Sequence, residues 1–163
     1  METFSVLFVC RANLCRSPTA HAVLRKKICA QGLEPWVSVD SASTHDHYPS
    51  GPPDPRSQQH AATRGYDLSD LRSRPIQPAD FEKADLILVM DLDNLRVLQE
   101  TCPAQHAGKL RRLTDFCVVG RSEVVPDPYF GVHQDFEHVL DLVEDACDGL
   151  LQHVRTRRND PAS

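Results

Sequence analysis

FSVLFVCRANLCRSPTA, residues 4–20, has the pattern of a strand, a loop and the start of a helix. Residues 4–9 are rich in β-formers and apolar at both odd and even positions, which is typical of a strand buried on both faces of a parallel sheet. Ser17 can cap a helix that opens with Pro18. The segment therefore predicts a central strand, a connection over residues 10–16 and a helix that ends at Gly32.

The rest of the chain continues to alternate strands with helices. Further strands are predicted at 36–39, 86–90 and 110–113, where short apolar or β-rich runs occur. Helices are predicted near 56–64 and after Asp91, which can cap the second of them. This alternation predicts an α/β layer fold with a mostly parallel sheet of four strands, in which ligands bind at the carboxyl ends of the strands.

The last helix is marked by an apolar stripe against an acidic face. We interpret the acidic residues as a solvated helix surface and the proline-containing segment 40–55 as an irregular surface loop. We expect one domain over residues 1–157, followed by a frayed tail at 158–163. The stripe consists of Phe136, Val139, Leu140, Val143, Cys147, Leu150, Leu151 and Val154, and the acidic face of Asp135, Glu137, Asp141, Glu144, Asp145 and Asp148.

Length and composition limit the class of protein. The chain has 163 residues, of which 40% are hydrophobic and 25% charged, and this fits one ordinary domain. The longest apolar run, at 86–90, is far shorter than the roughly 20 residues that span a bilayer. We expect no secretory signal, because a strand-like apolar run is reached by residue 4 without a basic leader. We therefore expect a cytoplasmic protein, and we also expect a monomer. Its net charge of −5 disfavours nucleic acid and anionic membranes as partners.

The loop from Cys10 to Ser17 has the form of an anion cradle. A loop that leaves a strand and enters a helix directs successive backbone N–H groups at one point, and the helix dipole adds partial positive charge there. The loop contains neither glycine nor lysine, so it is not a Walker loop. Arg16 can hold two oxygens of a phosphoryl group, and Asn13 tolerates the left-handed turn that glycine would otherwise make. We expect a phosphate-like oxyanion to bind here.

Cys10 stands at the base of this cradle. The helix dipole and Arg16 favour its thiolate, and Ser17 can donate a hydrogen bond to it. The expected chemistry is attack of sulfur on phosphorus, a covalent cysteinyl-phosphate, and hydrolysis by water. The spacing of Cys, five residues, Arg and Ser is a weak motif alone, but the strand before it and the proline-opened helix after it make it specific.

A phosphate ester also needs an acid to protonate its leaving oxygen. The candidate is Asp127, which is bracketed by Pro126 and Pro128 and followed by the aromatic pair Tyr129 and Phe130. The prolines stiffen the loop and help to fix the carboxyl group. The alternative is a turn aspartate in a proline-rich connection.

Several segments together resemble a low molecular weight protein tyrosine phosphatase, and bacterial members in particular. The resemblance covers nearly the whole chain. It implies a flavodoxin-like three-layer fold with a central four-stranded parallel sheet and helices on both faces, and metal-free hydrolysis of phosphotyrosine in proteins. It implies Cys10 as nucleophile, Arg16 as phosphate binder and Asp127 as general acid, supported by Asn13 and Ser17. The segments are 6–10, 15–20, 53–56, 64–69, 90–95 and 127–129.

The same resemblance places His47, Tyr48 and Tyr129 on the walls of an aromatic cleft. It also makes the loop residues substrate-binding, namely Arg11, Ala12, Asn13, Leu14, Cys15 and Ser17. Arg11 and Ala12 depart from the family, which usually has an apolar or small residue and then glycine at these positions. We hypothesise that Arg11 favours substrates with acidic residues next to the phosphotyrosine.

The six cysteines have different expected roles. The family implies that Cys10 and Cys15 form a reversible disulfide on oxidation, which protects the nucleophile. The other four, Cys29, Cys102, Cys117 and Cys147, are expected to be buried or incidental thiols. No zinc-ligand spacing is present, so neither a metal nor a cofactor is expected.

Two other functions remain open at this point. An arsenate reductase would share the fold and the loop but would relay a disulfide through further cysteines, for which Cys102 and Cys117 are candidates. A phosphotyrosine-binding module without turnover is the second. As partners we expect phosphotyrosine proteins and, by family analogy alone, a bacterial tyrosine kinase.

Overall fold

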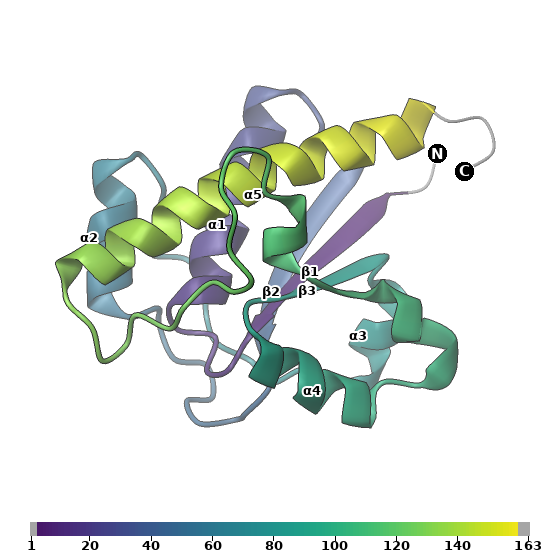
Figure 1. The fold of residues 1–163 in the computed structure, drawn as a ribbon, viewed down its shortest axis with the longest axis horizontal. Coiled ribbons are helices and arrows are strands. Elements are labelled where there is room, and N and C mark those ends of the chain that lie inside the picture. The colour runs from purple at the N-terminus through teal and green to yellow at the C-terminus, as the bar shows by residue number, and fades with distance from the viewer. Residues whose placement is uncertain (1–2, 160–163) are drawn as a thin grey trace.

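The computed structural model describes residues 3–159 and has a four-stranded, fully parallel sheet at its centre (Figure 1). The strand order is β2-β1-β3-β4, with β1 at Phe4–Cys10, β2 at Val37–Ser43, β3 at Leu86–Val89 and β4 at Leu110–Arg112. Parallel strands need crossover connections, and helices supply them. The predicted α/β fold with four parallel strands is confirmed.

The helices form a layer on each face of the sheet (Figure 1). On one face α1 packs against α5, and α2 lies against α5 in turn. On the other face, α3 and α4 contribute Phe81 and Leu98 to the core beneath the sheet. The helices are α1 at Arg16–Ala30, α2 at Pro55–Thr63, α3 at Pro78–Lys83, α4 at Leu92–Thr101 and α5 at His133–Asn159, with 3-10 turns η1 at Ala104–Lys109 and η2 at Leu113–Phe116.

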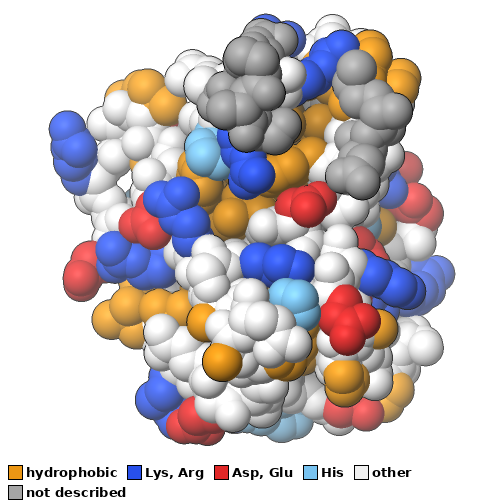
Figure 2. Space-filling model, turned by 90° about the vertical axis from the view of Figure 1, so that its right-hand side faces the viewer, with side chains coloured by type: hydrophobic (Ala, Val, Ile, Leu, Met, Phe, Trp, Pro, Cys, Tyr) orange, Lys and Arg blue, Asp and Glu red, His pale blue; other side chains and the backbone are white. Residues whose placement is uncertain are grey.

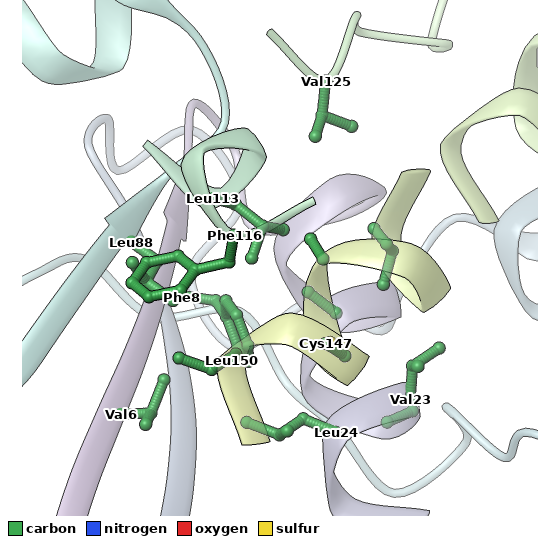
Figure 3. Packing of buried hydrophobic residues seen from close by; sticks show 14 of the residues in the cluster. Val6, Phe8, Val23, Leu24, Leu88, Leu113, Phe116, Val125, Cys147 and Leu150 are labelled. Carbon is green, nitrogen blue, oxygen red and sulfur yellow. The ribbon is translucent and has the colours of Figure 1, made fainter. Parts of the chain in front are cut away.

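The apolar residues of β1 are divided between two cores. Val6 and Phe8 face α1 and α5, where Leu24 and Leu150 pack against them (Figure 3). Leu7 and Val9 face the second core, on the side of α3 and α4. Because both faces of β1 are covered, its odd- and even-numbered positions both carry apolar side chains, as the sequence predicted.

Two local predictions at the ends of elements are wrong. Helix α1 begins at Arg16 with Cys15 as its N-cap, so Ser17 is not the cap; its hydroxyl contacts Cys10 instead. Strand β2 continues through Ser43, which pairs with Cys10 of β1, rather than ending at residue 39. β2 is an edge strand, where polar residues are tolerated, and its last residue also bonds to the backbone of Arg74.

The acidic face of α5 is not only a solvated surface. Glu137, Asp141 and Glu144 all contact Arg64 near the end of α2. Asp145 accepts hydrogen bonds from the backbone N–H groups of Val118, Val119 and Gly120, and Asp148 pairs with Lys27 of α1. These carboxylates attach neighbouring segments to α5.

The predicted tail falls partly outside the described residues. Residues 158 and 159 belong to α5, whereas 160–163 lie beyond the part of the chain that the structure describes.

Figure 2 looks onto the side where β1 begins and α5 ends, and Lys and Arg side chains there intermingle with Asp and Glu. Within residues 3–159, no helix combines the length and the apolar character needed to cross a membrane.

The strand order directs attention to one place on the sheet. β1 has β2 on one side and β3 on the other, and the chain crosses over in opposite directions to reach them. In open parallel sheets, ligands bind outside the carboxyl ends of the strands at such a reversal. The loops after β1 and β3 meet there.

We predict that His21 makes the fold sensitive to mild acid. This α1 residue is buried beside Ser41 of β2, with Nδ1 3.1 Å from Oγ, and burial lowers the pKa of His21 to about 4. An unfolded histidine has a pKa near 6.5, so between about pH 6.5 and pH 4 only the unfolded chain takes up this proton. The loss of unfolding free energy should reach about 3 kcal/mol at the lower end.

Urea unfolding of the wild type and of His21→Gln at pH 7 and pH 4.5 measures this loss. The variant should lose less unfolding free energy over the interval than the wild type, whatever its stability at pH 7. His138→Gln, at an exposed position of α5, is the control and should behave as the wild type. Equal losses in wild type and His21→Gln would contradict the assignment.

Candidate active site

The loop between β1 and α1 is closed by its own side chains. Asn13 has a positive φ of 58°, the left-handed conformation that the sequence predicted. Its amide donates to Ser17 Oγ at 2.6 Å, and its carbonyl oxygen accepts from Arg74 N at 3.2 Å. The backbone of residues 10 and 11 is also tied to the segment after β2, since Thr44 N donates to Cys10 O. The loop is therefore held from both sides.

Cys10 is the last residue of β1 and lies at the centre of this loop. Its Sγ is 3.0 Å from Ser17 Oγ and 3.4 Å from Ser17 N, at the first turn of α1. Because Ser17 Oγ already accepts the proton of Asn13 Nδ2, its own hydroxyl proton is free to point at the sulfur. A hydroxyl, a backbone N–H and a helix N-terminus thus all favour negative charge on Cys10.

Arg16 is a buried cation, only 2% exposed, and it is paired with carboxylates. Its Nη1 donates to Asp91 Oδ2 at 2.6 Å and to Val125 O at 3.0 Å, and its Nη2 lies 3.6 Å from Asp127 Oδ2. Burial works against the charged guanidinium, but the Cys10 thiolate and the two carboxylates outweigh burial and raise the pKa of Arg16 above its ordinary value. The side chain therefore stays cationic beside the sulfur.

Asp91 has two roles, of which the sequence predicted one. Its Oδ1 accepts from Asn94 N at 2.8 Å and caps α4, as predicted. Its Oδ2 holds Arg16, and this role was missed. The available signal was its position immediately after the apolar run of β3, at the same edge of the sheet as the loop after β1.

The predicted pocket residues do come together in one cavity of about 160 Å³. Asp127 is part of its wall, 3.6 Å from Arg16, and Tyr129 and Phe130 follow, their ring centroids 4.9 Å apart. Asn13 and Ser17 are not among the lining residues; their side chains bond to each other, and that of Ser17 contacts Cys10. Their role in substrate binding stays a prediction. The lining consists of Cys10, Arg11, Ala12, Leu14, Cys15, Arg16, His47, Tyr48, Asp127, Tyr129 and Phe130.

Helix α2 positions the Asp127 loop through contacts that the sequence did not reveal. Arg56 Nη2 donates to the backbone oxygen of Tyr129 at 2.9 Å and to Asp54 Oδ2 at 2.8 Å. The same guanidinium stacks over the ring of Phe136, 4.8 Å from its centroid. Asp54 N in turn donates to Leu14 O at 2.9 Å. The first turn of α2 therefore contacts both walls of the pocket.

Arg11 lies at the rim with its side chain half exposed, and its Nη1 is 3.9 Å from Asp93 Oδ2. His47 forms the next part of the rim, stacked on His45 with ring centroids 5.3 Å apart. A cationic side chain at this place can reach a residue flanking the bound group. Its charge is only partly balanced, because Asp93 also pairs with Arg96.

The cysteines divide by location. Cys15 is buried and lines the pocket with Cys10, and burial raises the pKa of its thiol to about 12. Cys147 is buried in the core near α1 (Figure 3), and Cys29 is exposed. Cys102 and Cys117 are half-buried, and neither lines the pocket. Among residues 3–159, no group of three or more His, Cys, Asp or Glu side chains is arranged to hold a metal ion.

Comparison with known proteins gives a consistent result over nearly the whole chain. A family model described as low molecular weight phosphotyrosine protein phosphatase matches residues 5–160. A low molecular weight protein-tyrosine-phosphatase of Streptomyces coelicolor is 40% identical over 156 residues, which cover 94% of each chain. The low molecular weight phosphotyrosine protein phosphatase of Homo sapiens is 37% identical over 156 residues, or 92% of this chain and 95% of its own.

Solved structures of protein tyrosine phosphatases are also similar to this chain. The crystal structure of a protein tyrosine phosphatase from Entamoeba histolytica, with Hepes in the active site, superimposes with a TM-score of 0.93 at 36% identity and covers 96% of this chain and 99% of its own. The crystal structure of YfkJ from Bacillus subtilis gives a TM-score of 0.90 at 30% identity, covering 96% and 98%. Both similarities cover nearly the whole chain.

We predict that Asp91 is needed chiefly to balance the charge of Arg16. Asp91→Ser keeps a residue that can cap α4 but leaves a buried guanidinium without its carboxylate, which should lower the unfolding free energy by about 3 kcal/mol. Inorganic phosphate should restore more stability to this variant than it adds to the wild type, because the bound anion replaces the missing charge. Urea unfolding with and without phosphate measures both effects.

The matched control is Asp93→Ser, two residues further along α4. The Asp93 carboxylate is half exposed and pairs with surface arginines. Its removal should therefore lower the unfolding free energy by less than about 1 kcal/mol. Equal losses for the two variants, or no extra stabilisation of Asp91→Ser by phosphate, would show that the buried pair does not have this role.

Proposed function

The chain belongs to the low molecular weight phosphotyrosine protein phosphatase family, and from that premise we propose that it hydrolyses phosphotyrosine in proteins with Cys10 as its nucleophile. The observation that carries the proposal is the environment of the Cys10 sulfur. It lies at the N-terminus of α1, beside the hydroxyl of Ser17 and the buried cation Arg16, in a pocket that Asp127 faces.

The first step transfers the phosphoryl group to sulfur. The Cys10 thiolate attacks phosphorus, the S–P bond forms, and the bond from phosphorus to the tyrosyl oxygen breaks. Asp127 donates its proton to that oxygen, so tyrosine leaves neutral and Asp127 becomes a carboxylate. Arg16 and the backbone N–H groups of the loop stabilise the charge on the equatorial oxygens.

The second step returns the enzyme to its starting state. Water attacks phosphorus, the Asp127 carboxylate accepts a proton from that water, and the S–P bond breaks to release inorganic phosphate and the thiolate. Ser17 assists here because its hydroxyl, 3.0 Å from the sulfur, stabilises the leaving thiolate. Each atom and proton is accounted for without a metal ion, and we propose a metal-free reaction.

The walls of the pocket suit an aryl phosphate better than an alkyl one. Tyr48, Tyr129 and Phe130 supply aromatic surfaces on which a phenyl ring can stack. Proteins phosphorylated by a bacterial tyrosine kinase are the natural substrates by family analogy. A cytoplasmic location and a monomeric state stay predictions.

The alternatives have less support. An arsenate reductase needs a cysteine relay, but Cys102 and Cys117 are outside the pocket lining, whereas Asp127 belongs to it. A module that only binds phosphotyrosine has no use for an acid in the same pocket as the nucleophile. Hydrolysis uses all three of Cys10, Arg16 and Asp127.

We predict that the protein hydrolyses para-nitrophenyl phosphate in the presence of EDTA. Cys10→Ser should have no activity, and the rate of Asp127→Asn should be lower by a factor of roughly 10² to 10⁴. If Asp127 protonates the leaving oxygen, its loss should matter most for aryl phosphates whose phenols are weak acids. Initial rates across a series of substituted phenyl phosphates give this dependence. Asp148→Asn, which removes a partner of Lys27 outside the pocket, is the control. A uniform slowing across the series would argue against the acid role.

We predict that Arg11 selects for acidic residues beside the phosphotyrosine. Arg11→Ala should lower the kcat/KM ratio of an acidic to a neutral phosphopeptide by about two- to fivefold, the range of one exposed ion pair. Raising the salt concentration should shrink the effect in the wild type. Arg121→Ala, at an exposed position away from the pocket lining, should leave the ratio unchanged. Equal ratios in Arg11→Ala and wild type would contradict the hypothesis.

We also propose that Cys10 and Cys15 form a disulfide under peroxide. If so, a thiol reductant should restore most activity to peroxide-treated wild type and much less to Cys15→Ser, because an unprotected sulfenic acid is oxidised further. Cys29→Ser, which removes an exposed cysteine of α1, should recover as the wild type does. Full recovery of Cys15→Ser would count against the disulfide.

A further inference from the structure

The loop that carries Tyr48, one of the aromatic walls of the pocket, is attached to a single buried serine. Ser73 is 3% exposed, and its Oγ donates to the backbone oxygen of Tyr48 and accepts from Gly51 N at 2.8 Å. Its backbone N donates to Gly51 O at 2.8 Å, and its backbone oxygen accepts from Ser50 N at 2.9 Å. Four hydrogen bonds therefore join residues 48–51 to Ser73, which itself is not among the residues that line the pocket.

These bonds hold the loop in a tight conformation. Ser50 has a positive φ of 55°, which a residue other than glycine keeps only where the surrounding structure imposes it. At Gly51, a Cβ atom would lie 3.3 Å from both Ser73 Oγ and the backbone oxygen of Tyr48. The loop is thus closely packed on the Ser73 side chain at the point where Tyr48 leaves it.

The residue that follows Ser73 supports the other side of the pocket. Arg74 N donates to Asn13 Oδ1 at 3.2 Å, at the left-handed turn of the anion-binding loop. Arg74 O accepts from Ser43 N at 2.8 Å, which anchors this segment to the end of β2. Two consecutive residues therefore hold the anion-binding loop and the loop of Tyr48, and their spacing relates the aromatic wall to the place where the phosphoryl group binds.

The position of the Tyr48 ring depends on the backbone that carries it. The side chain lines the pocket and is 49% exposed, so packing surrounds it only in part. Aromatic rings gain from contact only in certain arrangements, with centroids roughly 4.5–7 Å apart. The wall formed by Tyr129 is attached differently, through Arg56 and its bond to the Tyr129 backbone oxygen. Movement at Ser73 would therefore displace one aromatic wall and leave the other in place.

We propose that Ser73 is a positioning residue that holds Tyr48 against the aromatic ring of the substrate and so increases the preference of the pocket for aryl phosphates. The proposal rests on the proposed function, because it concerns how the same pocket recognises the tyrosyl ring. It separates two parts of recognition: the anion-binding loop holds the phosphoryl group, and the Ser73 hydroxyl determines how well the ring attached to that group is contacted.

Removal of the hydroxyl has a defined consequence. Ser73→Ala loses the two bonds made by Oγ, including the one to the Tyr48 backbone, but keeps the two made by its own backbone. The loop should stay attached while the Tyr48 ring becomes less well placed. Affinity for a ligand with a phenyl ring should fall by about two- to tenfold, the range of one aromatic contact. Affinity for inorganic phosphate, which has no ring, should not change.

The experiment measures the Kd of phenylphosphonate and of inorganic phosphate by isothermal titration calorimetry. It compares the reduced wild type with Ser73→Ala, Tyr48→Ala and the double variant. We expect each single variant to bind phenylphosphonate more weakly and phosphate as the wild type does. The double variant should bind phenylphosphonate no more weakly than Tyr48→Ala, because Ser73 acts through Tyr48. Ser38→Ala, which removes a hydrogen bond to Ser5 at the other end of β2, is the control and should bind both ligands normally.

Each result bears on the role of Ser73. Unchanged binding of phenylphosphonate by Ser73→Ala would overturn it, as would a further loss in the double variant relative to Tyr48→Ala. If Ser73→Ala also binds phosphate more weakly, or does not fold, Ser73 supports the site as a whole and the specific role is overturned. Calorimetry detects binding without turnover, so a wild type that binds both ligands but hydrolyses no aryl phosphate would contradict the proposed function and leave the positioning of Tyr48 to be decided by the variants.

Discussion

The buried guanidinium of Arg16 is the constraint on which the site depends. A cation that is 2% exposed must be paired, because an unpaired buried charge costs several kcal/mol. Arg16 meets this need with Asp91 after β3, with the backbone of Val125, and with Asp127 in the last loop before α5. One side chain therefore fixes three connections that are distant in sequence. The requirement to pair a charge and the requirement to assemble a pocket are met by the same contacts.

Helix α2 supplies a second, independent link between the same walls. Arg56 holds the backbone at Tyr129, and Asp54 N holds the loop at Leu14. At the other end of α2, Arg64 binds the carboxylates of α5. Single exposed ion pairs contribute little, but these are joined in a network and anchor a nine-residue helix that has a small buried area of its own. The acidic face of α5 thus indirectly steadies the loop that carries Asp127.

The sequence predicted those features of the fold and the site that are determined by residues close together in the chain. Residues 4–17 specify their strand and loop locally, and the turn at Asn13 follows from its own conformational preference. The sequence did not predict that Asp91 pairs with Arg16 or that Arg56 reaches Tyr129, because these pairs are 75 and 73 residues apart and no periodic pattern reports them. It also assigned Ser17 to a helix cap, since a hydroxyl before proline usually has that role. Here the Ser17 hydroxyl contacts the Cys10 sulfur instead of capping the helix.

The net charge of −5 is compatible with the binding of an anion because the pocket balances charge locally. Arg16 is offset by Asp91 and lies close to Asp127, so its charge alone does not account for affinity. Much of the attraction must come from backbone N–H groups of the loop and from the N-terminus of α1, which no carboxylate neutralises within its first turn.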